Sequence, residues 1–293
     1  MSGSILVTGA SGHLGRRVVE LLVARGGGAR IIAATRKPES LAALTAQGVE
    51  ARRVDFDDEA SLTGAFQGVE RVLLISTDSL DEPGKRGRQH ARAVHAVAAA
   101  GVKHVAYTSI TNPANSKILI SKDHADTEAE LAKAGVPFTV LRNNMYSDYQ
   151  LPPLQRAFAS GKLVDAKASG KIGFVTREDC ARIAAAVLSE PPSGNQVLDV
   201  TGPETLSSAD LVAIANELSG RKLEYQPVPL EALIDGMVQH GLPRPLAEVY
   251  GSFDAGTAAG ELDVTSDAVA RFTGQKPQAI RDFLAANKAA WAV

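Results

Sequence analysis

Cysteine is almost absent from this sequence, because Cys180 is the only one among 293 residues. A single cysteine excludes an intramolecular disulfide framework and any cysteine-rich zinc or iron–sulfur site. The histidines are not spaced with carboxylates or with the cysteine as metal ligands are. This applies to His90, His95, His104 and His124. We therefore expect no bound metal ion.

An excess of charge of either sign is missing as well. The chain has 31 Lys and Arg against 33 Asp and Glu, for a net charge of −2, which argues against a polyanion-binding protein. The basic run 85–90 lacks the interleaved aromatic residues of a nucleic-acid site. We interpret it as a surface helix entry and expect no nucleic-acid partner.

Long hydrophobic runs are also missing. No stretch of about 18 or more apolar residues occurs, so no membrane-spanning helix is expected. The first residues lack the basic region, apolar stretch and cleavage site of a secretory signal. The expected location is therefore the cytoplasm.

What the sequence does contain is a regular alternation of short apolar runs and longer amphipathic patterns. A glycine follows several of the helical patterns, as it does at helix ends. This alternation predicts an α/β fold of the Rossmann type, with a doubly wound parallel sheet and helices on both faces. The predicted strands are Ile5–Thr8, Ile31–Thr35, Ala51–Val54, Arg71–Ile75, Lys103–Ser109 and Phe138–Leu141.

The rhythm changes after Arg142, where proline and glycine become frequent. We expect residues 1–150 to form a nucleotide-binding domain, with returning elements near 170–220. Residues 151–293 should form mainly a smaller C-terminal substrate lobe and a last helix, with Pro277 near that helix's first turn. The stretch Glu231–Glu261, rich in Gly, Pro and Ala, is interpreted as a mobile part of this lobe. Further predicted elements are Arg177–Leu188, Gln196–Val200, a helix from Ser207 to Gly220, and an edge strand at Leu223–Val228.

The strongest motif is a glycine loop between the first strand and the first helix. Gly9 allows the tight turn, Gly12 lets the backbone approach a pyrophosphate, and Gly15 permits close packing of helix on strand. Amide groups at a helix start bind an anion. The alternative is a glycine-rich turn without a ligand. The residues predicted to hold a dinucleotide here are Thr8, Gly9, Ala10, Ser11, Gly12, His13 and Leu14.

The end of the second strand indicates which dinucleotide binds. An NAD site usually places an acidic residue there to bond the ribose 2′-hydroxyl. Here Arg36 and Lys37 follow the strand instead, and a 2′-phosphate would gain a charge-assisted bond from Arg36. The sequence therefore favours NADP(H) over NAD(H), unless the two cations lie in a solvated loop.

Two further strand ends should meet in the same crevice, since ligands of such sheets lie beyond the carboxyl ends of the strands. Asp55 and Phe56 close the third strand and are predicted to flank the adenine. Ser76 and Thr77 close the fourth strand, beside the nicotinamide ribose.

With these motifs in place, the chain resembles the NmrA-like group of atypical short-chain dehydrogenases. It is similar to bacterial type 2 NAD(P)H:quinone oxidoreductases and to triphenylmethane-dye and azo-dye reductases. The resemblance covers nearly the whole chain and is closest in residues 3–150. Beyond the glycine loop it is carried by the segments Leu73–Ser76, Ala100–His104, Ala106–Ser109, Leu141–Ser147 and Gly170–Val175.

The resemblance implies NADPH as hydride donor and a substrate cleft between the cofactor and the lobe. It also implies cofactor contacts from the Asn143–Tyr146 loop, including Asn143 and Asn144. Tyr146 follows the sixth strand and is a candidate to stack on a flat substrate, although it is as compatible with covering a loop. A homodimer is common among such folds.

Most short-chain dehydrogenases use a Tyr and a Lys four residues apart to protonate a carbonyl. Lys122 lies near the right place, but Ile118 stands where the Tyr would be. A quinone or cationic dye needs less help, because a hydride adds directly and water supplies the proton. Lys122 is kept as a candidate catalytic residue, with a solvent-facing lysine as the alternative.

The sequence therefore predicts an enzyme, an NADPH-dependent oxidoreductase that acts on a small aromatic acceptor such as a quinone or a dye. Two alternatives stay open. An NmrA-like redox sensor would bind the dinucleotide without turnover, and an isoflavone-reductase-like enzyme would use Lys122 as its proton relay.

Overall fold

Within residues 3–292, which the computed structural model describes, seven parallel strands form the central sheet. Their order is β3-β2-β1-β4-β5-β6-β9. The chain therefore starts in the middle of the sheet, winds outward in one direction and returns to wind in the other. The strands are β1 (Ser4–Val7), β2 (Arg30–Thr35), β3 (Glu50–Arg53), β4 (Arg71–Leu74), β5 (His104–Ile110), β6 (Phe138–Asn143) and β9 (Gln196–Val200).

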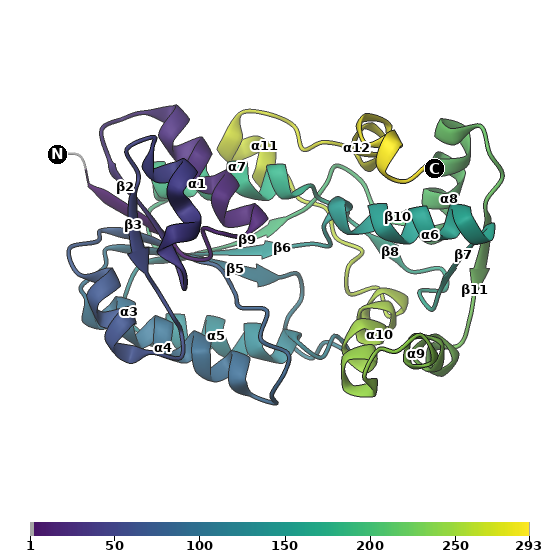
Figure 1. The fold of residues 1–293 in the computed structure, drawn as a ribbon, viewed down its shortest axis with the longest axis horizontal. Coiled ribbons are helices and arrows are strands. Elements are labelled where there is room, and N and C mark those ends of the chain that lie inside the picture. Colours follow the sequence, from purple (N-terminus) through teal and green to yellow (C-terminus); the bar gives the residue numbers. More distant parts are fainter. Residues whose placement is uncertain (1–2, 293) are drawn as a thin grey trace.

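Helices cover both faces of this sheet (Figure 1). One face packs against α1, α7 and α11, and the other against α3, α4 and α5. The strand residues of β1, β4 and β5 are almost entirely buried, as expected for strands between two helical layers. The helices are α1 (His13–Arg25), α2 (Ala42–Thr45), α3 (Glu59–Phe66), α4 (Lys85–Ala99), α5 (Ser121–Lys133), α7 (Arg177–Ser189) and α11 (Ala268–Thr273).

The predicted doubly wound sheet is confirmed, with every predicted strand of the first 150 residues present to within two residues. Several predicted helix stops are confirmed too: Gly68, Gly101 and Gly135 all have positive φ just beyond α3, α4 and α5. Cys180 is buried in α7 as a small core residue.

The second part of the chain builds a lobe beyond the carboxyl ends of β5 and β6 (Figure 1). It has its own apolar core, in which Trp291 and Phe158 pack with ring centroids 5.5 Å apart. Its elements are α6 (Leu151–Ser160), β7 (Lys162–Asp165), β8 (Lys171–Ile172), β10 (Leu206–Ser207), α8 (Ser208–Ser219), β11 (Glu224–Pro227), α9 (Leu230–Gln239), α10 (Arg244–Ala258) and α12 (Ile280–Ala286).

A nearly buried ion cluster holds this lobe together. The Lys167 ammonium lies 2.8 Å from Asp165 and 3.2 Å from Asp254, so it bridges β7 to α10. Asp165 also accepts hydrogen bonds from Ser208 and Tyr225. Lys167 pairs with both carboxylates, so its removal alone would leave Asp165 and Asp254 buried without the cation that neutralises them.

Two details of the lobe differ from the sequence-based predictions. Glu231–Glu261 folds into α9 and α10, which composition did not predict. Pro277 lies before the last helix, not in its first turn, because α12 begins at Ile280 after Ala279. The edge strand β11 is confirmed, paired in parallel with β7.

Across residues 3–292 no helix is both long and apolar enough to span a membrane. Among these same residues, no group of three His, Cys, Asp or Glu side chains is arranged to hold a metal ion.

Candidate functional site

The glycine loop lies where β1, β2 and β4 end. The Thr8 hydroxyl donates to the Leu73 carbonyl at 3.0 Å and accepts from the Ile75 amide at 2.9 Å. The Ala10 amide donates to the Ala34 carbonyl at 3.0 Å, and Gly9 turns the chain at φ +61°. The loop is thus fastened to both neighbouring strands, at the carboxyl edge of the sheet.

Gly12 and Gly15 have different surroundings. A Cβ on Gly15 would lie 2.4 Å from the Gly9 carbonyl oxygen, so only glycine lets α1 pack on the turn. A Cβ on Gly12 would meet only that same oxygen, at 3.3 Å, and Gly12 is solvent-exposed. The first turn of α1 carries no acidic residue. Its free amides therefore leave the exposed side of Gly12 suited to an anion.

Arg36 and Lys37 are exposed directly after β2. Among the residues that the structure describes, neither side chain has a hydrogen bond or ion pair. Two uncommitted cations therefore stand beside the glycine loop. Their charge is available to an anionic ligand.

The residues that follow β3 and β4 are less exposed to solvent than Arg36 and Lys37. Asp55 is half-buried and pairs with Arg53 at 3.4 Å, while Phe56 is buried in the core beneath α3 and α4. Ser76 and Thr77 are both half-buried after β4. Sheet order places these two strand ends on opposite sides of the glycine loop.

Two asparagines at the carboxyl end of β6, Asn143 and Asn144, differ in their hydrogen bonding. Both ends of the Asn144 amide are used inside the protein, by the Leu262 carbonyl at 3.0 Å and the Met145 amide at 2.8 Å. Asn143 donates to the Tyr146 hydroxyl at 3.0 Å, but its side-chain oxygen Oδ1 is buried and has no hydrogen-bond partner among residues 3–292. An orphaned acceptor at the carboxyl end of a strand suits a ligand with a donor group.

Tyr146 belongs to an aromatic and cationic cluster at this edge. Its ring lies 5.5 Å from that of Tyr149, and the Arg177 guanidinium lies 4.7 Å from the Tyr149 ring. Arg177 is also paired with Asp148 at 3.4 Å. Burial raises the pKa of Tyr146, so its hydroxyl stays protonated.

Lys122 lies in the first turn of α5, with most of its side chain exposed (78%). Its ammonium bonds Asp126, which raises its pKa. Ile118 is buried in the apolar core of the lobe. The neighbouring Lys117 amide donates to the Glu261 carboxylate at 2.9 Å. The segment that holds the Tyr in other short-chain dehydrogenases thus anchors the lobe here.

A buried polar cluster next to Thr77 was missed by the sequence reasoning, which considered the histidines only as metal ligands and rejected them. It joins Arg86, His90, Tyr107 and His124 behind the end of β4. The available signal was the spacing of Arg86 and His90, which are one helical turn apart on α4.

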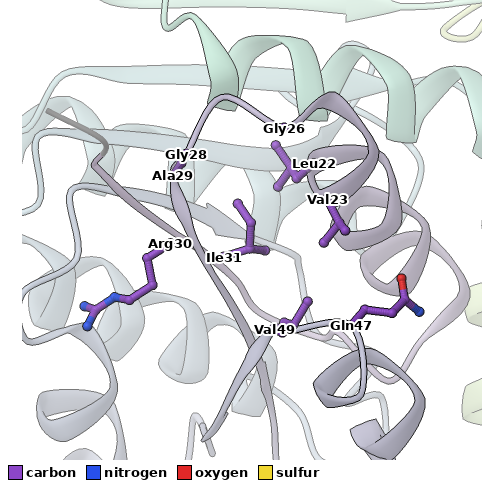
Figure 2. Close-up of a pocket in the computed structure, with 10 residues that line it drawn as sticks. Leu22, Val23, Gly26, Gly28, Ala29, Arg30, Ile31, Gln47 and Val49 are labelled. Carbon is purple, nitrogen blue, oxygen red and sulfur yellow. The ribbon is translucent and has the colours of Figure 1, made fainter.

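A hollow of about 190 Å³ lies at a different edge of the sheet. Its lining includes Leu22, Val23, Ile31 and Val49, at the amino ends of β2 and β3 (Figure 2). That edge is opposite the glycine loop. The polar side chains drawn there come from the first residue of β2, Arg30, and from the turn after α2, Gln47.

Known proteins share this architecture and much of this sequence. Quinone oxidoreductase 2 of Escherichia coli is 36% identical over 270 residues, covering 92% of this chain and 93% of that protein. The crystal structure of the E. coli NADPH-dependent quinone oxidoreductase with NADPH has a TM-score of 0.91 at 34% identity, covering 97% and 99% of the two chains.

The Citrobacter sp. triphenylmethane reductase, crystallised with NADP(H), has a TM-score of 0.90 at 34% identity, covering 98% and 99%. The NAD(P)H azoreductase of Xenophilus azovorans is 27% identical, covering 98% of this chain and 99% of that one. Residues 1–284 match the model of the NmrA-like family. The chain therefore belongs to the NmrA-like family.

Proposed function

We propose that this protein is an NADPH-dependent oxidoreductase that transfers a hydride to a quinone or to a quinone-like dye. The observation that carries the proposal is the match to quinone and triphenylmethane reductases at 34–36% identity over nearly the full chain. The uncommitted Arg36 beside the glycine loop supports the choice of NADPH.

The residues of the crevice suit NADPH. The first turn of α1 after Gly12 offers free amides for the pyrophosphate, and Arg36 offers a bidentate cation for the 2′-phosphate. The unpartnered Asn143 oxygen suits an amide or hydroxyl donor of the nicotinamide half. The half-buried Asp55 after β3 is proposed to lie on the adenine side, with Phe56 buried beneath it. Bound NADPH supplies the hydride, and the chain supplies its placement.

The acceptor is a planar aromatic molecule held between the glycine-loop edge of the sheet and the lobe that contains α6, α8, α9, α10 and α12. Tyr146 and Tyr149 offer ring faces at the carboxyl end of β6 for such a molecule. Rate acceleration then comes mainly from holding the nicotinamide close to the acceptor in the right orientation. Water then supplies the proton, because the exposed Lys122 is paired with Asp126.

The test is a stoichiometric assay with purified protein. One NADPH should be consumed for each quinone converted to hydroquinone, with saturation in both substrates. A preparation that binds NADPH tightly but reduces no quinone or dye would contradict the proposal and favour a redox sensor.

A further inference from the structure

Three successive amides after β4 are each held by a side chain from a different element. The Ile75 amide donates to Thr8 of the glycine loop at 2.9 Å, and the Ser76 amide donates to Thr108 of β5 at 2.9 Å. The Thr77 amide donates to Nε2 of His90 on α4 at 3.0 Å. All three acceptor side chains are buried. The path of this segment is therefore set by side chains rather than by strand pairing.

Thr77 is held on its carbonyl side as well. Arg86 Nε donates to the Thr77 carbonyl oxygen at 2.7 Å, and the guanidinium continues to the Ile120 carbonyl at 3.2 Å. Only 4% of Arg86 is exposed. His90 and Arg86 thus bind both backbone polar groups of one residue, Thr77, just beyond the carboxyl end of β4.

The hydrogen-bond partners of His90 and His124 determine which ring nitrogen of each histidine is protonated. A backbone amide only donates, so Nε2 of His90 must be unprotonated, and its Nδ1 carries the proton toward Thr127 at 3.0 Å. A guanidinium also only donates, so His124 accepts from Arg86 at Nε2 and donates from Nδ1 to Tyr107 at 2.9 Å. Both histidines are neutral.

This assignment agrees with the burial of the site. Desolvation, with the nearby Arg86 charge, lowers the pKa of His90 to about 3 and that of His124 well below its ordinary value. Asp123 pairs with Arg86 at 3.5 Å on the far side. The His90 acceptor is therefore present throughout the neutral pH range.

We infer that His90 is a positioning residue for the nicotinamide half of the cofactor, and that it acts through Thr77. This inference rests on the proposed function, because it needs a dinucleotide in the crevice. In such sheets the dinucleotide crosses the switch point between the first strand and its far neighbour. Here those strands are β1 and β4, so the adenosine half lies toward Arg36 and the nicotinamide half over residues 75–77.

The experiment compares two ligands, NADPH and 2′,5′-ADP, which has the adenosine half and the 2′-phosphate but no nicotinamide. His90→Leu removes the acceptor of the Thr77 amide. We expect the Kd of NADPH to rise about tenfold, the worth of one buried hydrogen bond, and the Kd of 2′,5′-ADP to stay within about twofold. His90→Gln, which places an amide oxygen near the Nε2 position, should restore most of the NADPH affinity.

The matched control is His104→Leu. His104 is also a buried histidine with a threonine partner, Thr139 at 3.0 Å, but it starts β5 at the opposite edge of the sheet. Its loss should lower the Tm without changing the ratio of the two Kd values. If His90→Leu changes both Kd values equally or changes neither, the positioning role is wrong.

Thr108→Val provides a second arm in case His90→Leu does not fold. It removes the acceptor of the Ser76 amide and should also weaken NADPH selectively. An unchanged ratio in that variant would overturn the inference. Failure of the proposed function has a different signature, because the unmodified protein would then bind NADPH without reducing any quinone or dye, while the comparison of the two Kd values would be unaffected.

Discussion

The hydroxyl oxygens of Ser11 and Thr35 lie 2.8 Å apart, which bonds the tip of the glycine loop to the last residue of β2. Arg36 follows Thr35 directly, is exposed, and has no side-chain partner in the part of the chain that the structure describes. The two parts of the proposed site for a 2′-phosphorylated dinucleotide are thus linked to each other before any ligand arrives. Preorganisation of this kind lowers the entropic cost of binding.

Arg36→Ala should weaken NADPH by about 1.5–3 kcal/mol, the contribution of a hydrogen bond to a charged group, and leave NADH nearly unchanged. Isothermal titration with both cofactors measures this. Arg25→Ala is the control, because it removes the same charge from the far end of α1. Equal losses for NADPH and NADH would show that Arg36 does not bind the 2′-phosphate.

The two glycines of the loop should separate binding from stability. Gly15→Ala forces a Cβ against the Gly9 carbonyl and should lower the free energy of unfolding by about 1–3 kcal/mol. Gly12→Val should leave a folded protein that no longer binds NADPH, since its side chain enters the pyrophosphate position.

Gly64→Ala is the matched control for these variants. Gly64 lies within α3 with open space around its Cα, so alanine should raise stability by about 0.5–1 kcal/mol without an effect on binding. Urea unfolding and NADPH titration on all three proteins give the comparison. A folded Gly12→Val protein with normal NADPH affinity would remove the basis for the pyrophosphate site.

Lys122→Ala should keep kcat/KM for quinone reduction within about twofold of the unmodified protein, because the lysine is exposed and paired with Asp126. An isoflavone-reductase-like mechanism needs this lysine as a proton relay and predicts a loss of at least about a hundredfold. Initial rates at saturating NADPH distinguish the two. A loss of that size would contradict proton supply by water and support the lysine-dependent mechanism.

Stability should fall on mild acidification. Burial lowers the pKa of His90 to about 3 and that of His104 to about 4. It also lowers the pKa of His124 well below its ordinary value. The unfolded chain therefore binds more protons than the folded one below about pH 6.5. Each of these histidines should lower the free energy of unfolding as the pH falls, approaching about 1.4 kcal/mol per pH unit.

Urea unfolding at pH 7, 6 and 5 measures this slope, above the range in which most carboxylates titrate. His104→Gln should reduce the slope by the share of one histidine. The loss of unfolding free energy due to His104 stops growing near pH 4, and the loss due to His90 stops growing near pH 3. A stability that does not change between pH 7 and 5 would mean that these histidines take up protons in the folded protein.

The parallel sheet was predictable because β1, β2, β4, β5 and β6 are largely apolar runs separated by helical patterns with glycine ends, whereas the charged β3 was recognised mainly by its place in the alternation. The glycine loop and Arg36 were predictable for the same reason, since they occupy fixed places in that pattern. The helices α9 and α10 were not, because glycine and proline reduce helix propensity, and packing overrides it: Gly251 faces Ile234 and Gly256 faces Ile118.

The whole polar cluster behind Thr77 could not be predicted from the sequence for a different reason, although Arg86 and His90 lie one helical turn apart. His90 and His124 lie 34 positions apart, on separate helices, and Tyr107 comes from the strand between them. Each residue alone is typical of core or surface. Only the folded sheet brings the hydrogen-bonding groups together.

The central claim is that this chain is a hydride-transferring reductase and not only a dinucleotide-binding protein. The most direct measurement is the initial rate of NADPH oxidation by the purified protein with a small panel of quinones and of azo and triphenylmethane dyes, with NADH in parallel. We predict saturable turnover that prefers NADPH. Absence of turnover with every acceptor, in a preparation shown to bind NADPH, would contradict the claim.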